Sequence, residues 1–131
     1  MILTTIRKYL ESIPGILFVY VYGSFGSERY KEGKSDIDIA IFGDRIFRFD
    51  ELMDMADELQ RQIPGHPDID LIDLNQDAII LNNQVIRTGK LIYCIDEEAH
   101  SNYVITQWSR YIDFKEYMKR FDQDLKERIL K

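Results

Sequence analysis

Cysteine, proline and long apolar runs are all scarce in this sequence of 131 residues. Its one cysteine, Cys94, has no partner for an internal disulfide, so a cytoplasmic location is the default expectation. No stretch approaches the ~20 consecutive apolar residues that a membrane span needs. The apolar run at the N-terminus is also too short for a signal peptide. These absences favour a globular domain held together by its own core.

The sequence also lacks a surplus of basic residues. Lys and Arg number 17 against 23 Asp and Glu, which gives a net charge of −6. This balance argues against a general nucleic-acid binder, so we expect no direct contact with nucleic acid and none with a membrane. It is compatible with an enzyme that binds a nucleotide through Mg²⁺, and with a basic protein partner. The length fits a single domain.

Histidines are few, and they are not grouped with cysteine. His66 lies beside two prolines in a predicted loop, and His100 lies near a predicted helix start, where we expect it to be solvated. Neither belongs to a His/Cys cluster, so a zinc site is not expected. No Ser-His-Asp or Cys-His arrangement is evident either.

What the sequence does contain is a Gly-Ser pair followed by two alternating carboxylates. The apolar run 19–22 ends in Gly23-Ser24, and after eleven further residues comes Asp36-Ile37-Asp38. Strand alternation puts both carboxylates on one face, about 7 Å apart. Because like charges this close repel, a cation is expected between them, and Mg²⁺ suits such oxygen ligands. The backbone N–H groups after Gly23 and the Ser24 hydroxyl suit a phosphate.

Each of these features also has a purely structural interpretation. Asp36 and Asp38 could face solvent on an edge strand whose isoleucines face the core. Gly23 and Ser24 could form an ordinary strand-to-helix turn in which Ser24 caps the helix. The joint occurrence of both motifs, each beside an apolar β-rich run, favours the metal and phosphate interpretation.

Hydrophobic periodicity predicts an α/β (α+β) fold, with helices packed on a small mixed β-sheet of about four strands. Antiparallel pairing of the first two strands is plausible, because the connection between them is short. We expect residues 1–96 to form the core. The predicted strands span 16–22, 36–42, 68–74 and 90–95, and the predicted helices span 4–12, 24–30, 50–63 and 76–88, the last capped by Asn75.

Residues 97–131 have a helical pattern and contain neither glycine nor proline. They fit one long helix, or two helices broken near residues 111–114, as a C-terminal extension of the same domain. Two interpretations of their apolar stripe stay open: packing on the sheet, or a partner surface. The stripe consists of Val104, Trp108, Tyr111, Phe114, Met118, Phe121, Leu125 and Ile129.

Gly23-Ser24, the eleven-residue gap and Asp36-Ile37-Asp38 resemble the signature of the DNA polymerase β-like nucleotidyltransferase superfamily. The small size and the acidic strand 68–74 resemble its minimal nucleotidyltransferase (MNT) branch. The resemblance covers about residues 3–95 and implies the polymerase β-like nucleotidyltransferase fold. Members of this branch are commonly paired with a HEPN-domain protein as antitoxin and toxin.

The resemblance also implies roles for particular residues. Asp36 and Asp38 would hold the Mg²⁺ ions, two in number, that bind the triphosphate of ATP, and Gly23 and Ser24 would contact its phosphates. Asp70 best matches the third carboxylate, which would ligate the metal and help deprotonate the acceptor, with Asp68 as the alternate. Many relatives have Ala-Arg-Gly where this chain has Gly-Ser-Glu at 26–28, so one expected phosphate contact is missing.

The function that follows from the resemblance is a Mg²⁺-dependent nucleotidyltransferase and antitoxin. It would transfer AMP from ATP to a hydroxyl, expected to be a tyrosine of a cognate HEPN toxin, and would form a hetero-oligomer with that toxin. A second hypothesis is neutralisation of the toxin by stable binding without catalysis. A third is a small-molecule nucleotidyltransferase, although 131 residues leave little room for an acceptor-binding domain.

Overall fold

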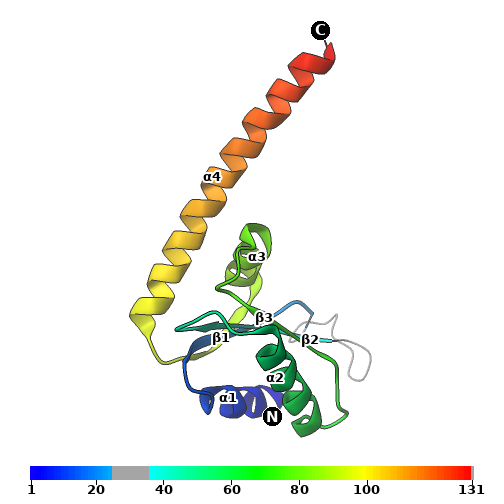
Figure 1. Cartoon of the computed structure of the whole chain (residues 1–131), viewed down its shortest axis with the longest axis vertical. Helices are drawn as coiled ribbons and strands as arrows, with labels where there is room; N and C mark the ends of the chain where they lie inside the picture. The colour runs from blue at the N-terminus through cyan, green and yellow to red at the C-terminus, as the bar shows by residue number, and fades with distance from the viewer. Residues whose placement is uncertain (25–35, 131) are drawn as a thin grey trace.

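The computed structural model describes residues 1–24 and 36–130, which contain four helices and four strands (Figure 1). The predicted short helix 24–30 therefore falls almost wholly outside the described residues. The elements are α1 (Ile2–Glu11), β1 (Ile16–Tyr22), β2 (Ile37–Gly43), α2 (Phe49–Gln62), β3 (Ile69–Asp73), α3 (Ile79–Thr88), β4 (Lys90–Cys94) and α4 (Glu97–Leu130).

The four strands form one mixed sheet in the order β3-β2-β1-β4. The central strand β1 is antiparallel to both β2 and β4, whereas β2 and β3 run parallel. The predicted mixed sheet and the antiparallel pairing of the first two strands are confirmed. In β1 six of the seven residues are buried, as expected for a strand that is covered on both faces.

Each face of the sheet carries its own layer of helices (Figure 1). On one face α1 and α2 pack through Ile6, Leu10 and Leu59 onto alternate residues of β1 and β2 such as Val19 and Ile39. On the other face Val85 of α3 and Tyr103 of α4 cover Phe18, Tyr20, Tyr22 and Ala40. This second face also contains the carboxylates described below.

The start of α3 differs from the prediction. The helix begins at Ile79, not at residue 76, and Asn75 is not its cap. The Asn75 amide instead donates to the backbone carbonyls of Gly43, at 2.9 Å, and Arg45, at 3.1 Å. The amide of Asn82 donates to the Gln76 carbonyl at 3.0 Å. These bonds hold residues 75–77 in a non-helical conformation, so α3 begins only at Ile79.

The C-terminal segment forms one continuous helix, α4, with no break near residues 111–114. Its first turns lie on the sheet and along α3, where Tyr103 and Gln107 are buried. Beyond α3 the helix projects away from the rest of the described chain (Figure 1). Of the predicted apolar stripe, Val104, Tyr111 and Phe114 are half-buried, whereas Trp108 is 48% exposed and Met118, Phe121, Leu125 and Ile129 are exposed as well. No helix of the described residues is long and apolar enough to cross a membrane.

Candidate functional site

Three strand ends meet at one end of the sheet, and their residues are in register. Tyr22, the last residue of β1, lies opposite Asp38 of antiparallel β2. Asp38 in turn lies opposite Asp70 of parallel β3. Register partners project from the same face of a sheet, with side chains about 5 Å apart. The fold thus brings together Asp38 and Asp70, which are far apart in the sequence.

The electrostatics of the site reflect this crowding of like charges. Burial raises the pKa of Asp38, and the nearby charges of Asp70 and Asp36 raise it further. Asp38 is half-buried, whereas Asp36 and Asp70 are exposed. The three predicted carboxylates are therefore close enough to interact, and Asp38 in particular favours a proton or a cation beside it.

Gly23 packs directly against this carboxylate. It has a φ of +74°, in the left-handed region, and a Cβ built at this position would overlap Oδ2 of Asp38. Glycine is therefore required at residue 23 both for the backbone conformation and for the close approach of Asp38. Ser24, the next residue, is half-buried, and the predicted Gly-Ser motif thus lies beside Asp38.

The two other acidic residues of this segment have different surroundings. Asp68, the alternate third carboxylate, lies directly before β3 and is exposed. Its carboxylate accepts a hydrogen bond at 3.0 Å from Gln60 on α2, which covers the opposite face of the sheet. Asp73 is buried, and its two oxygens accept 2.9 Å bonds from the backbone N–H groups of Phe47 and Asn75.

The polymerase beta nucleotidyltransferase family matches residues 4–98, which contain this whole cluster. The chain belongs to this family. A further match is to the protein adenylyltransferase MntA of Shewanella oneidensis, at 30% identity over 92 residues. The match covers 67% of this chain and 61% of MntA, so the chain spans about three fifths of the length of that relative.

Solved structures of toxin–antitoxin complexes share this nucleotidyltransferase fold. A toxin–antitoxin structure with AMP-PNP matches with a TM-score of 0.81 and 23% identity, over 94% of this chain and 97% of that chain. A tri-AMPylated Shewanella oneidensis HEPN toxin in complex with its MNT antitoxin matches with a TM-score of 0.74 and 22% identity, over 95% and 98% of the two chains. At these identities the matches establish the fold.

Tyr22 is a residue of this candidate site that the sequence analysis missed. It lies opposite Asp38, and burial raises the pKa of its hydroxyl, with the charges of Asp70 and Asp38 adding to the rise. Gly89, just after α3, brings the helix end close to it, because a Cβ at Gly89 would lie 3.3 Å from the Tyr22 Cβ. The sequence did contain a signal for Tyr22, because this residue directly precedes the Gly23-Ser24 motif.

His100 is the one histidine whose surroundings contradict the prediction. It is half-buried instead of fully solvated: its Nε2 lies 2.6 Å from the Tyr20 hydroxyl, and its ring packs edge-on against Phe18 at 4.8 Å between centroids. The first turn of α4 lies against β1 here, and burial lowers the pKa of the imidazole. His100 thus anchors α4 to the sheet through Tyr20 and Phe18.

The donor chemistry of the carboxylate cluster fits Mg²⁺. Asp36, Asp38 and Asp70 offer hard oxygen ligands, and burial, together with the charges of Asp70 and Asp36, raises the pKa of Asp38, so a cation beside it would be favourable. Within residues 1–24 and 36–130 no three acidic, histidine or cysteine side chains converge tightly enough to form a metal site as they stand.

Proposed function

We propose that this chain is an antitoxin and a Mg²⁺-dependent nucleotidyltransferase that transfers AMP from ATP to a tyrosine hydroxyl of a cognate HEPN toxin. The observation that carries the proposal is the pair of carboxylates Asp38 and Asp70, held in register on adjacent strands beside Gly23. It is supported by the similarity to MntA, a protein adenylyltransferase, and by the shared fold with an antitoxin seen in complex with a tri-AMPylated HEPN toxin.

Each residue has a defined role in this proposal. Asp36 and Asp38 hold Mg²⁺, which when bound neutralises charge on the triphosphate and on the departing pyrophosphate. Gly23 allows the backbone to approach a phosphate closely, and Ser24 offers it a hydroxyl. Asp70 orients the acceptor hydroxyl and accepts its proton. The acceptor oxygen bonds to the α-phosphorus, and the bond from this phosphorus to pyrophosphate breaks.

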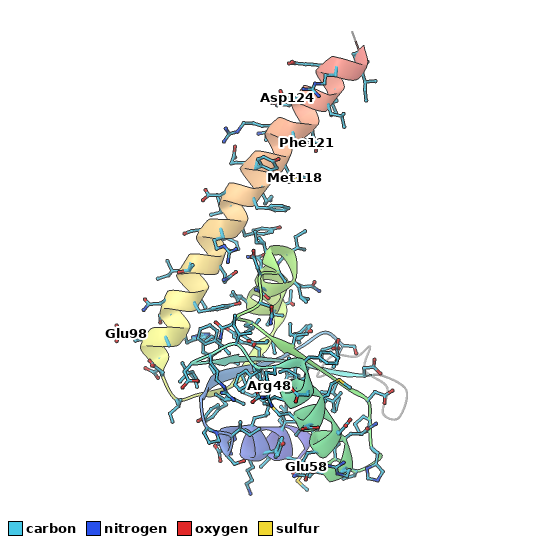
Figure 2. All side chains as sticks on the ribbon, viewed as in Figure 1. Arg48, Glu58, Glu98, Met118, Phe121 and Asp124 are labelled. Atoms are coloured by element: carbon cyan, nitrogen blue, oxygen red, sulfur yellow. The ribbon has the colours of Figure 1, made fainter. Side chains whose placement is uncertain are left out.

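The outer half of α4 is the proposed surface for the toxin. Phe121 is 50% exposed and Ile129 is 73% exposed, and with Met118 and Leu125 they continue one side of the helix. Figure 2 shows Met118 and Phe121 on the projecting part of the helix, with no other described element beside them. Exposed apolar patches of this kind are characteristic of protein–protein contacts.

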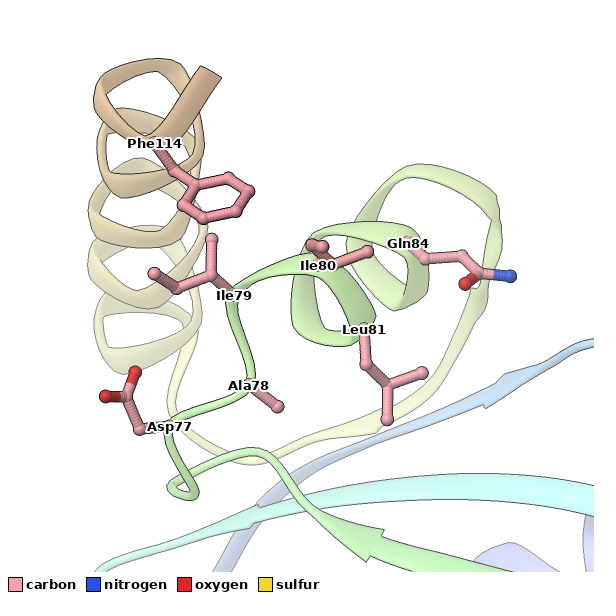
Figure 3. A pocket seen from close by; sticks show the side chains of 7 residues that line it. All are labelled: Asp77, Ala78, Ile79, Ile80, Leu81, Gln84 and Phe114. Carbon is pink, nitrogen blue, oxygen red and sulfur yellow. The ribbon is translucent and has the colours of Figure 1, made fainter. Parts of the chain in front are cut away.

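A groove between α3 and α4 extends this surface toward the sheet. It encloses about 500 Å³ and is lined by Ile79, Ile80 and Leu81 of α3 and by Phe114 of α4 (Figure 3). Phe114 belongs to the same stripe as Met118 and Phe121. The groove and the stripe together favour a second candidate function, in which stable binding alone neutralises the toxin. A cytoplasmic location, suggested by the single cysteine, suits both candidates.

The experiment that separates the two is the intact mass of the co-expressed HEPN toxin after incubation with this chain, ATP and Mg²⁺. We expect the toxin to gain one or more AMP units with the unaltered chain and none with Asp38→Ala. Toxin that gains no mass, yet is blocked in a stable complex, would establish the binding function instead. If transfer survived the double change Asp36→Ala and Asp38→Ala, the assignment of these two carboxylates would be wrong.

A further inference from the structure

The strand that contains Asp70 has an open edge. Ile37 N–H donates to the Asp68 carbonyl at 2.9 Å, and Leu74 N–H donates to the Ile41 carbonyl at 2.8 Å. In residues 68–74 the even-numbered residues thus direct their backbone N–H and C=O groups toward β2. The backbone N–H and C=O groups of Ile69 and Leu71 therefore point away from the sheet. No other strand of the described residues pairs with this side of β3. An extended peptide can bond to such an edge.

An apolar cavity of about 340 Å³ lies along the same edge, between α2 and α3. Its walls come from both helices, from β3 and from the loop before α2, and its apolar lining is Phe47, Phe49, Leu52, Leu71, Ile72, Ala78 and Leu81. Phe49 is 77% exposed although it is aromatic. Water contact at this ring costs free energy that a bound apolar group would recover.

The buried polar side chains of the cavity already have partners. Both carboxylate oxygens of Asp73 accept backbone N–H groups, and the amide nitrogen of Asn82 donates to the Gln76 carbonyl. A polar ligand would have to compete for these groups, whereas an apolar one would not. The adenine of ATP needs donors and acceptors for its ring edge, so this cavity suits it less well than an aliphatic or aromatic side chain.

The cavity is also at a fixed distance from Asp70. Leu71 and Ile72, which line it, follow Asp70 directly along β3. At a rise of about 3.3 Å per residue, the cavity centre lies roughly 3–10 Å along the strand from the carboxylate. A peptide paired with β3 that presents a hydroxyl to Asp70 would place a nearby side chain in the cavity.

We infer that this cavity binds a bulky apolar side chain of the acceptor protein, about one to three residues from the tyrosine that receives AMP. The acceptor segment runs extended along the open edge of β3, so that backbone bonds set its register and the cavity selects its sequence. This inference rests on the proposed function and names the recognition element of the protein substrate.

Steady-state AMP transfer to the co-expressed HEPN toxin tests the inference, with toxin and ATP varied separately. Phe49→Ala removes a wall of the cavity and Leu52→Trp fills it. Ile46→Ala is the matched control, because Ile46 is an exposed apolar residue of the same loop that does not line the cavity. We expect both cavity variants to raise the acceptor KM about tenfold, with the ATP KM unchanged and kcat within about twofold. Ile46→Ala should match the unaltered chain.

Three results would contradict this expectation, each in its own way. A rise in the ATP KM alone would make the cavity an adenine site and overturn the inference. Unchanged constants for both cavity variants, with normal transfer, would show that the acceptor does not use the cavity. Absence of transfer by the unaltered chain would refute the proposed function, and the inference with it. Circular dichroism of Leu52→Trp confirms that any loss is not caused by unfolding.

Discussion

Gly23 couples the backbone of the candidate site to its central carboxylate, Asp38. Any residue with a side chain would be strained at its left-handed φ. The absence of a Cβ also leaves the space that Asp38 Oδ2 occupies. These are separate requirements, because the first concerns stability and the second concerns the position of Asp38. A second glycine of the chain allows them to be measured separately.

We expect Gly23→Ala to lower the free energy of unfolding by about 1–2 kcal/mol through backbone strain, and AMP transfer about 100-fold through displacement of Asp38. Gly65→Ala is the matched control, because Gly65 has a φ of +85° and no atom within 4 Å of its built Cβ. It should lose similar stability and keep full transfer. Equal loss of transfer in both variants would mean that the contact with Asp38 is irrelevant.

The raised pKa of Asp38 has a consequence for stability. In the folded chain its charged form is disfavoured by burial and by Asp70 and Asp36. The stabilisation that this group contributes is therefore complete below its unfolded pKa and is lost as pH rises through the higher folded pKa. At neutral pH without a divalent cation, Asp38→Asn should raise the melting temperature.

Thermal unfolding between pH 4 and 8, with and without Mg²⁺, checks this expectation. Mg²⁺ should raise the melting temperature of the unaltered chain at neutral pH, less so in acid, and should have little effect on Asp38→Asn. Asp113→Asn, an exposed change on α4, should behave like the unaltered chain throughout. A lower melting temperature for Asp38→Asn in the absence of metal would show that the charge repulsion is not felt in the folded state.

At the scale of elements, β3 has two acidic residues with opposite roles. Asp70 faces the site, whereas Asp73 is only 3% exposed and fixes the loops on either side of it. Its carboxylate is the partner of two backbone N–H groups, those of Phe47 before α2 and Asn75 after β3. One side chain thereby holds the entry to α2 and the turn to α3 in place.

Asp73→Ala should lower the free energy of unfolding by about 2–4 kcal/mol, because it leaves two N–H groups unsatisfied near the core. The comparison is Asp77→Ala, which removes an exposed ion pair with Arg110 and should cost less than about 1 kcal/mol. Urea denaturation of both variants measures the difference. Similar losses would mean that water replaces the Asp73 oxygens without penalty.

The elements were predictable from sequence because their patterns are local. The strand 16–22 is rich in β-branched and aromatic residues, and its predicted bounds match β1. The start of α3 was not predictable, because Asn75 bonds to Gly43 and Arg45, which are distant in sequence. The contact between Gly23 and Asp38 was not predictable either, because it depends on the register between β1 and β2. The choice of Asp70 over Asp68 depends on the register between β2 and β3, which places Asp70 opposite Asp38.

At the scale of the whole molecule, α4 divides into an anchored part and a projecting part. His100 and Tyr103 attach its beginning to the sheet, the latter through a 3.1 Å bond to the Leu74 carbonyl. Residues 115–130 are all exposed, so they add little to the core. The sequence predicted the stripe but not where packing ends, because that point depends on the length and position of α3.

Phe121→Glu should therefore weaken toxin binding at least about tenfold, while the stability of the isolated chain changes by no more than about 0.5 kcal/mol. Gln123→Glu adds the same charge on the opposite side of α4 and should leave binding unchanged. Titration calorimetry with the HEPN toxin measures both variants. Equal affinities would place the partner surface elsewhere on the chain.

The pairing of the central strand has a consequence for synthesis of the protein. One edge of β1 pairs with β2, which is synthesised soon after β1. The other edge pairs with β4, which is synthesised much later and places Cys94 opposite Phe18. Until residues 90–94 have left the ribosome, a nascent chain exposes an edge with the sequence Ile-Leu-Phe-Val-Tyr-Val-Tyr. Such a segment readily adds strands from other chains. Slow translation before β4 would therefore favour aggregation, and rapid completion of β4 protects the newly made protein.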